Sequence, residues 1–101
     1  MIIYVDIDET VCFYKGARVY KDAKPILERI NQINELYDKG NTIVYWTARG
    51  STSGIDWHEL TKKQLLEWGA KHHDLKLGKP HFDMYICDKS INCDSFFKEE
   101  G

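Results

Sequence analysis

The feature that most constrains this chain is an alternation of short apolar runs with helical patterns. Residues 2–7 and 42–46 are rich in β-branched and aromatic side chains and are apolar on both faces, which is typical of strands buried on both sides. Between them, residues 23–39 carry isoleucines at helical spacing, with Pro25 in the first turn and Gly40 after the last one. Because a crossover that contains a helix joins parallel strands, this order predicts an α/β fold.

The rest of the chain continues the alternation. A second helical pattern covers residues 56–69, and two shorter apolar runs predict strands at 75–77 and 84–87. We therefore expect a doubly wound, Rossmann-like domain with a mostly parallel sheet and helices on both faces. The 101 residues are enough for one such domain, spanning residues 1–101.

One segment departs from the alternation. Residues 11–14 and 17–20 flank a Lys15–Gly16 turn, and this pattern predicts a small hairpin in place of a crossover helix. The hairpin would directly follow the first predicted strand.

The composition argues against several classes of protein. Fourteen basic and sixteen acidic residues give a net charge of −2, so nucleic acid is not expected as a bulk partner. No apolar run reaches the ~20 residues of a membrane helix, and the chain opens on an apolar run without the charged segment of a signal peptide. The three cysteines have no C-x-x-C spacing, which favours reduced thiols in a cytoplasm.

Polar residues stand where the predicted strands end. They are Asp6 and Asp8 after the first strand, Thr47 after the second, Lys79 before the last and Asp88 after it. In an open parallel sheet the ligand crevice lies beyond the carboxyl ends of the strands, so we expect these side chains at one rim. Three carboxylates there would repel one another unless a divalent cation neutralised them, and oxygen ligands suit Mg²⁺. A phosphate would then bind the metal ion, the charge of Lys79 and the hydroxyl of Thr47.

The segment Asp6-Ile7-Asp8-Glu9-Thr10 resembles the D-x-D-x-T/V signature of the haloacid dehalogenase-like (HAD) phosphohydrolases. Thr47, Lys79 and Asp88 are similar, in this order, to the second, third and fourth motifs of that family. The resemblance covers residues 6–88, nearly the whole chain. Within the family, the chain looks closest to small capless phosphatases of polysaccharide or capsule biosynthesis.

The resemblance implies a Mg²⁺-dependent phosphomonoester hydrolase that works through an aspartyl-phosphate. In this reading Asp6 is the nucleophile, and Asp8 is the general acid and then the general base. The substrate would be held by Thr47, Ala48, Arg49 and Lys79, of which Thr47 and Lys79 also act on the transferring phosphoryl group, and the metal by Asp6, Asp8 and Asp88.

The resemblance also bears on the surroundings of the site. The hairpin at 11–20 would be the mobile flap of the family. One hairpin and one helix fill the intervals in which relatives insert a cap domain, so we expect none. Such an open site suits a phosphorylated small molecule, with a sugar phosphate favoured, or a larger phosphorylated substrate; alternatively, a second copy of the chain covers it in a homo-oligomer.

Several assignments stay open. Arg49 either binds the substrate or pairs with an acid at the surface, and either Asp94 or water completes the metal shell. His72 and His73 are expected at the surface or in loops rather than at a metal ion, because adjacent side chains point in different directions and no third ligand has matching spacing; the lesser alternative is a substrate contact. The alternative functions are a phosphoryl-accepting module and an inactive, phosphatase-like binding module.

Overall fold

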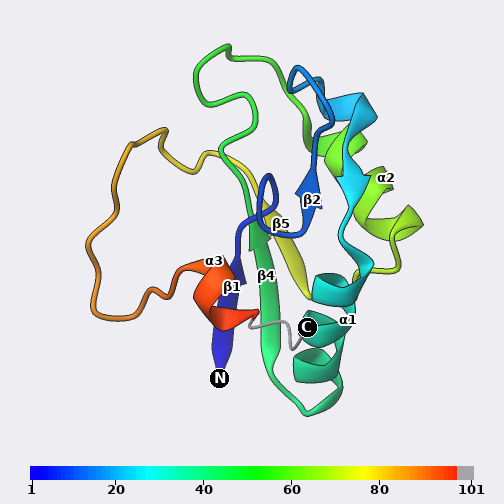
Figure 1. The fold of residues 1–101 in the computed structure, drawn as a ribbon, viewed down its shortest axis with the longest axis vertical. Helices are drawn as coiled ribbons and strands as arrows, with labels where there is room; N and C mark the ends of the chain where they lie inside the picture. The colour runs from blue at the N-terminus through cyan, green and yellow to red at the C-terminus, as the bar shows by residue number, and fades with distance from the viewer. Residues whose placement is uncertain (98–101) are drawn as a thin grey trace.

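The computed structural model describes residues 1–97. Its main sheet has three parallel strands, in the order β1 (Ile2–Val5), β4 (Thr42–Trp46) and β5 (Asp74–Lys76). β4 pairs with both neighbours, and all three strands run in the same direction (Figure 1). Their carboxyl ends therefore meet at one edge of the sheet.

Two helices connect these strands. α1 (Leu27–Asp38) lies between β1 and β4 along the chain, and α2 (His58–Glu67) lies between β4 and β5. Figure 1 shows both helices to the right of the strands. Ile30 and Ile33 of α1 and Leu65 of α2 are buried in one apolar core with residues of β1 and β4. The expected α/β, Rossmann-like fold with parallel strands is thus confirmed.

The segment after β1 differs from the expected hairpin. β2 (Cys12–Phe13) pairs in antiparallel with β3 (Lys24–Pro25), and not with residues 17–20. Residues 17–19 form a loop that leads into a 3₁₀ turn, η1 (Tyr20–Asp22). The predicted pairing was wrong because Cys12 is buried in the core while Val19 is exposed, so β2 pairs with the segment that enters α1.

This pairing also moves the start of α1. Pro25 belongs to β3 rather than to the first turn of the helix, which begins at Leu27. The amide of Ile26 donates to the carbonyl of Val11 at 2.8 Å and so extends the contact between the two segments. The end of the helix agrees with the prediction, since Gly40 has a φ of +97° and turns the chain toward β4.

The strand expected at 84–87 is not formed. Residues 77–92 make a long loop, on the left of Figure 1, that ends at the short helix α3 (Cys93–Phe96). Met84 and Ile86 are 77% and 90% exposed in this loop. The prediction was wrong because an apolar run becomes a strand only where a neighbouring strand and a core cover it, and here neither does.

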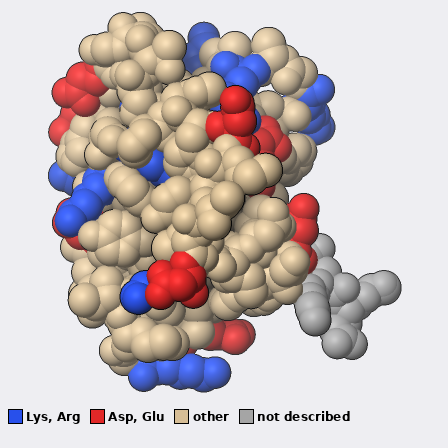
Figure 2. All heavy atoms as spheres, turned by 90° about the vertical axis from the view of Figure 1, so that its left-hand side faces the viewer, with Lys and Arg blue, Asp and Glu red and all other residues tan. Residues whose placement is uncertain are grey.

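Figure 2 shows the face of the molecule on the side of this loop. Uncharged atoms dominate it, and the acidic and basic side chains are scattered rather than gathered by sign. This face therefore offers no continuous basic area for a polyanion. Among residues 1–97, none of the helices has the length and apolar content that crossing a membrane requires.

Candidate active site

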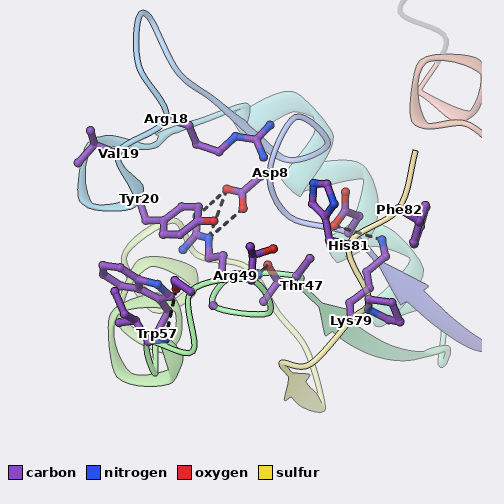
Figure 3. A pocket seen from close by; sticks show the side chains of 17 residues that line it. Asp8, Arg18, Val19, Tyr20, Thr47, Arg49, Trp57, Lys79, His81 and Phe82 are labelled. Atoms are coloured by element: carbon purple, nitrogen blue, oxygen red, sulfur yellow. Dashed lines mark hydrogen bonds and ion pairs between the residues drawn. The ribbon is translucent and has the colours of Figure 1, made fainter. Parts of the chain in front are cut away.

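The sheet edge that carries the strands' carboxyl ends forms one side of a hollow of about 590 Å³. Its walls include every predicted site residue except Asp88, namely Asp6, Asp8, Thr47, Ala48, Arg49 and Lys79. Residues 18–20, parts of 50–57 and residues 80–82 complete the walls (Figure 3). The volume lies within the ~300–1,000 Å³ common for small-molecule sites, so the hollow has room for more than a phosphate group.

Asp6 and Lys79 form an ion pair on one side of the hollow. Asp6 follows the last residue of β1, and its carboxylate lies 3.4 Å from Nζ of Lys79 and accepts a 3.2 Å hydrogen bond from the Thr10 hydroxyl. The Asp6 side chain is 39% exposed. Nζ of Lys79 also lies 5.6 Å from the ring centres of Trp46 and Phe82, which hold the ammonium group beside the carboxylate.

Asp8 and Arg49 form a second, buried ion pair. Nη2 of Arg49 donates to Oδ1 of Asp8 at 2.8 Å, and Nε lies 3.1 Å from Oδ2. This two-point contact matches the planar guanidinium to the carboxylate. The Arg49 side chain is fully buried, and that of Asp8 is 10% exposed. Figure 3 shows the pair between Tyr20 and Thr47.

The remaining Arg49 contacts come from α2 and from the segment after β2. Nη1 donates to Oγ1 of Thr61 at 3.1 Å and to Oε1 of Gln64 at 2.6 Å, and Nη2 also reaches the Tyr14 hydroxyl at 3.3 Å. Together with the contacts to Asp8, these bonds use all five N–H donors of the guanidinium. In this arrangement Arg49 has no donor left for a substrate.

The network changes the protonation of its members. Burial alone would raise the pKa of Asp8, but the hydrogen bonds and charge of Arg49, with the Tyr14 hydroxyl, outweigh it and hold the pKa below its ordinary value. Burial, then the hydrogen bond to Asp8, raises the pKa of Tyr14. Burial and the charge of Asp8 also raise the pKa of the Cys12 thiol to about 12. Asp8 is therefore ionised at neutral pH, while Tyr14 and Cys12 keep their protons.

Thr61 and Gln64 were missed in the sequence analysis. Both are buried polar residues on α2, and Gln64 also donates to the carbonyl of Tyr20 at 2.6 Å. A signal was available, because the two residues fall within the apolar stripe of this helix, beside Leu65. A polar side chain in such a stripe needs a buried partner, and Arg49 is that partner here.

Thr47 connects the ends of β4 and β5 to the loop that carries Lys79. It is buried, its amide donates to the carbonyl of Lys76 at 3.0 Å, and its own carbonyl accepts from the amide of Lys79 at 3.2 Å. Its hydroxyl accepts a hydrogen bond from the amide of Arg49 at 3.1 Å. These bonds hold the residue at the base of the hollow, between the two ion pairs.

Asp88 does not join the other two predicted metal ligands. It lies in the 77–92 loop with its side chain 83% exposed, 3.3 Å from Nζ of Lys89. Asp94 is also remote from the expected role, since it is 81% exposed and pairs with Arg29 at 3.0 Å. Within residues 1–97, no three acidic, histidine or cysteine side chains converge on a point that could hold a metal ion.

The adjacent histidines support the fold. The amide of Ile43 donates to Nδ1 of His73 at 3.1 Å, and the His73 ring stacks on Tyr37 with the centroids 4.7 Å apart. His72 lies edge-on to Tyr45 and contacts the carbonyl of Ala70. Neither lines the hollow.

The comparisons with known proteins bear on the fold alone. The structure is similar to the crystal structure of an MCSG target from Vibrio cholerae, with a TM-score of 0.85 and 24% sequence identity. The match covers 98% of this chain and 89% of that chain. No family model matches the chain, and no curated protein does. The α/β arrangement is therefore shared over almost the whole length.

Proposed function

We propose that this protein is a phosphomonoester hydrolase that works through an aspartyl-phosphate on Asp6. One observation carries the proposal: two acids, a threonine and a lysine from separate stretches of chain line the same hollow at the carboxyl ends of parallel strands. They are Asp6, Asp8, Thr47 and Lys79. The resemblance of their order to the HAD motifs assigns a role to each.

Asp6 has the exposure and the neighbour that a nucleophile at this site needs. An oxygen of its carboxylate would form a bond to phosphorus while the bond from phosphorus to the ester oxygen breaks. Lys79, 3.4 Å away, would be shared between Asp6 and the phosphoryl group and would offset the charge of both. The Thr47 hydroxyl would donate to a phosphoryl oxygen.

Asp8 would handle the protons of both steps. In its protonated form it would give a proton to the leaving oxygen; ionised again, it would take one from the water that hydrolyses the aspartyl-phosphate. The pairing with Arg49 favours the ionised form, which is the form that activates water. The first step therefore requires Asp8 to bind a proton before the leaving group departs.

Magnesium remains part of the proposal because of the resemblance, but the described side chains fit it only in part. The Asp6 carboxylate and the Asp8 carbonyl stand at the end of β1, whereas Asp88 lies outside the hollow. The expected set of three acids is thus not assembled. When bound beside Asp6, Mg²⁺ would offset the negative charge of the phosphoryl group, and turnover would then require it.

We further propose the finer features that the resemblance implies. These are a doubly wound sheet with helices on both faces, a mobile flap at 11–20 and no cap domain. The substrate would be a phosphorylated small molecule, a sugar phosphate above all, and a second copy of the chain could cover the open hollow. Cys12, Cys87 and Cys93 are all free, which suits a reducing cytoplasm.

Hydrolysis of p-nitrophenyl phosphate, followed with excess MgCl₂ and with EDTA, tests the proposal. We expect turnover that requires the metal, and its loss in Asp6→Asn. Asp38→Asn is the matched control, because Asp38 is an exposed acid that pairs with Lys71 away from the hollow. No hydrolysis of this compound or of a panel of sugar phosphates by the wild type would refute the proposal.

Such a result would favour the alternative of a phosphoryl-accepting or inactive binding module. Two observations favour this alternative. Asp88 lies outside the hollow, and Asp8 forms an ion pair with Arg49. Mass spectrometry after incubation with acetyl phosphate distinguishes the two modules. A stable phosphoryl adduct identifies the first, and its absence identifies the second.

A further inference from the structure

Arg49 joins three parts of the molecule that are distant in sequence. Its guanidinium contacts Asp8 after β1, Thr61 and Gln64 on α2, and Tyr14 in the segment between β2 and η1. Tyr14 closes the network, because its hydroxyl donates to the same Asp8 oxygen at 2.5 Å. A displacement of the guanidinium would therefore disturb all three parts.

The far end of the 14–20 segment is tied to the same network. Nε2 of Gln64 donates to the carbonyl of Tyr20 at 2.6 Å, so this amide bonds Arg49 at one end and Tyr20 at the other. The Tyr20 ring lies 4.8 Å from Cζ of Arg49 and meets Trp57 edge-on at 5.2 Å. Figure 3 shows Tyr20 and Trp57 beside Arg49 along one wall of the hollow.

The burial of Arg49 argues against direct contact with a substrate. Its side chain has no exposed area, and its five donors are already used. Withdrawing it from Asp8 would leave a buried charge without its partner, which is strongly unfavourable. Any effect of Arg49 on a reaction in the hollow must therefore pass through the groups that it holds.

We propose that Arg49 is a positioning residue that fixes the direction of the Asp8 carboxylate and couples it to the 14–20 segment, whose residues 18–20 form one wall of the hollow. The 14–20 segment then keeps a fixed position relative to the Asp8 carboxylate, and it moves only when the contacts of Arg49 rearrange. The catalytic part of this inference rests on the proposed function. The coupling between Arg49 and the 14–20 segment does not.

Hydrogen exchange tests the coupling without reference to activity. The amides of Asp22 and Ala23 donate to the carbonyls of Val19 and Tyr20 and report on the end of the wall. In Arg49→Lys, which keeps the charge but loses the planar fork, we expect these amides to exchange about tenfold faster.

Arg18→Lys is the matched control for this exchange. Arg18 belongs to the same segment but is 51% exposed and pairs with Glu9 at 3.5 Å at the surface. Because exposed pairs contribute little, we expect the two amides to exchange as in the wild type. Equal exchange in Arg49→Lys and the wild type would overturn the coupling.

Steady-state kinetics test the catalytic part. Arg49→Lys should lower kcat about tenfold or more and leave KM within about twofold, since misplacing a catalytic group slows the reaction without removing a substrate contact. A higher KM with unchanged kcat would overturn the inference and assign Arg49 to substrate binding. If the wild type hydrolyses no phosphomonoester, the proposed function fails and the exchange experiment alone decides the inference.

Tyr14→Phe covers the case in which Arg49→Lys does not fold. It removes one hydroxyl from the network and keeps the ring, which is partly exposed. We expect the same faster exchange at Asp22 and Ala23 and a smaller fall in kcat. Wild-type exchange together with wild-type kcat in this variant would overturn the proposal.

Discussion

Gly50 is the position where an added methyl group should be most harmful to the candidate site. It follows Arg49 and begins the loop that forms one wall of the hollow. Its φ is +81°, and a Cβ atom there would collide with the carbonyl oxygen of Ile55 and lie 3.2 Å from Cδ1 of Trp57. Gly54, in the same loop, has a φ of +77° but no atom within 4 Å of its Cβ position. The two glycines therefore separate the backbone effect from the packing effect.

The expected magnitudes follow from this difference. Gly54→Ala places an alanine in the left-handed region, which costs about 1–2 kcal/mol. Gly50→Ala adds a collision with backbone that cannot rotate away, and overpacking of this kind costs about 1–3 kcal/mol more. The free energy of unfolding should thus fall about 2 kcal/mol further in Gly50→Ala. For a domain of ~100 residues, this difference corresponds to roughly 10 °C in Tm.

Urea unfolding followed by tryptophan fluorescence measures both losses, provided that the m values of the variants agree. The turnover of the folded fraction should also fall more in Gly50→Ala, because the collision displaces Trp57 and the backbone next to Arg49. Equal losses of stability in the two variants, within about 0.5 kcal/mol, would refute the reasoning. The loop that contains Gly50 and Ile55 would then be free to move, and the collision with Ile55 would cost no stability.

Further predictions concern three buried groups. The Tyr45 hydroxyl is buried and has no hydrogen-bond partner within residues 1–97, so Tyr45→Phe should leave stability unchanged or raise it by up to about 1 kcal/mol in thermal unfolding; a clear loss would reveal a bound water. Because Asp8 has a folded-state pKa below its ordinary 3.8, its ionised form adds stability that is fully present above about pH 4 and is lost as pH falls through the folded value. Asp8→Asn should therefore lower the free energy of unfolding less in acid than at neutral pH. A loss of stability that does not depend on pH, measured by urea unfolding, would contradict this. The same variant should slow turnover by ~10²- to 10⁴-fold. The native Cys12 thiol, with a pKa of about 12, should react with iodoacetamide only after Cys87 and Cys93, as peptide mass spectrometry would show.

Local pattern was enough to predict the frame of the molecule. β-rich runs that alternate with amphipathic segments predict parallel strands and helices without knowledge of their tertiary neighbours, because each element buries its own apolar face. The ends of those strands share one edge, so Asp6, Asp8, Thr47 and Lys79 could be expected together before any coordinates were known. The structure places all four around the hollow.

Pairings between distant segments required the tertiary structure. Nothing local distinguishes residues 17–20 from β3 as the partner of β2, or decides whether 84–87 finds a strand to pair with and carries Asp88 to the hollow. The same holds for Arg49, whose neighbours in sequence are compatible with a substrate contact or a surface ion pair. Arg49 pairs with Asp8 because α2 covers the guanidinium and because all five of its N–H donors have acceptors in this position. Short-range periodicity reports on a single element, whereas burial and charge pairing depend on which elements meet.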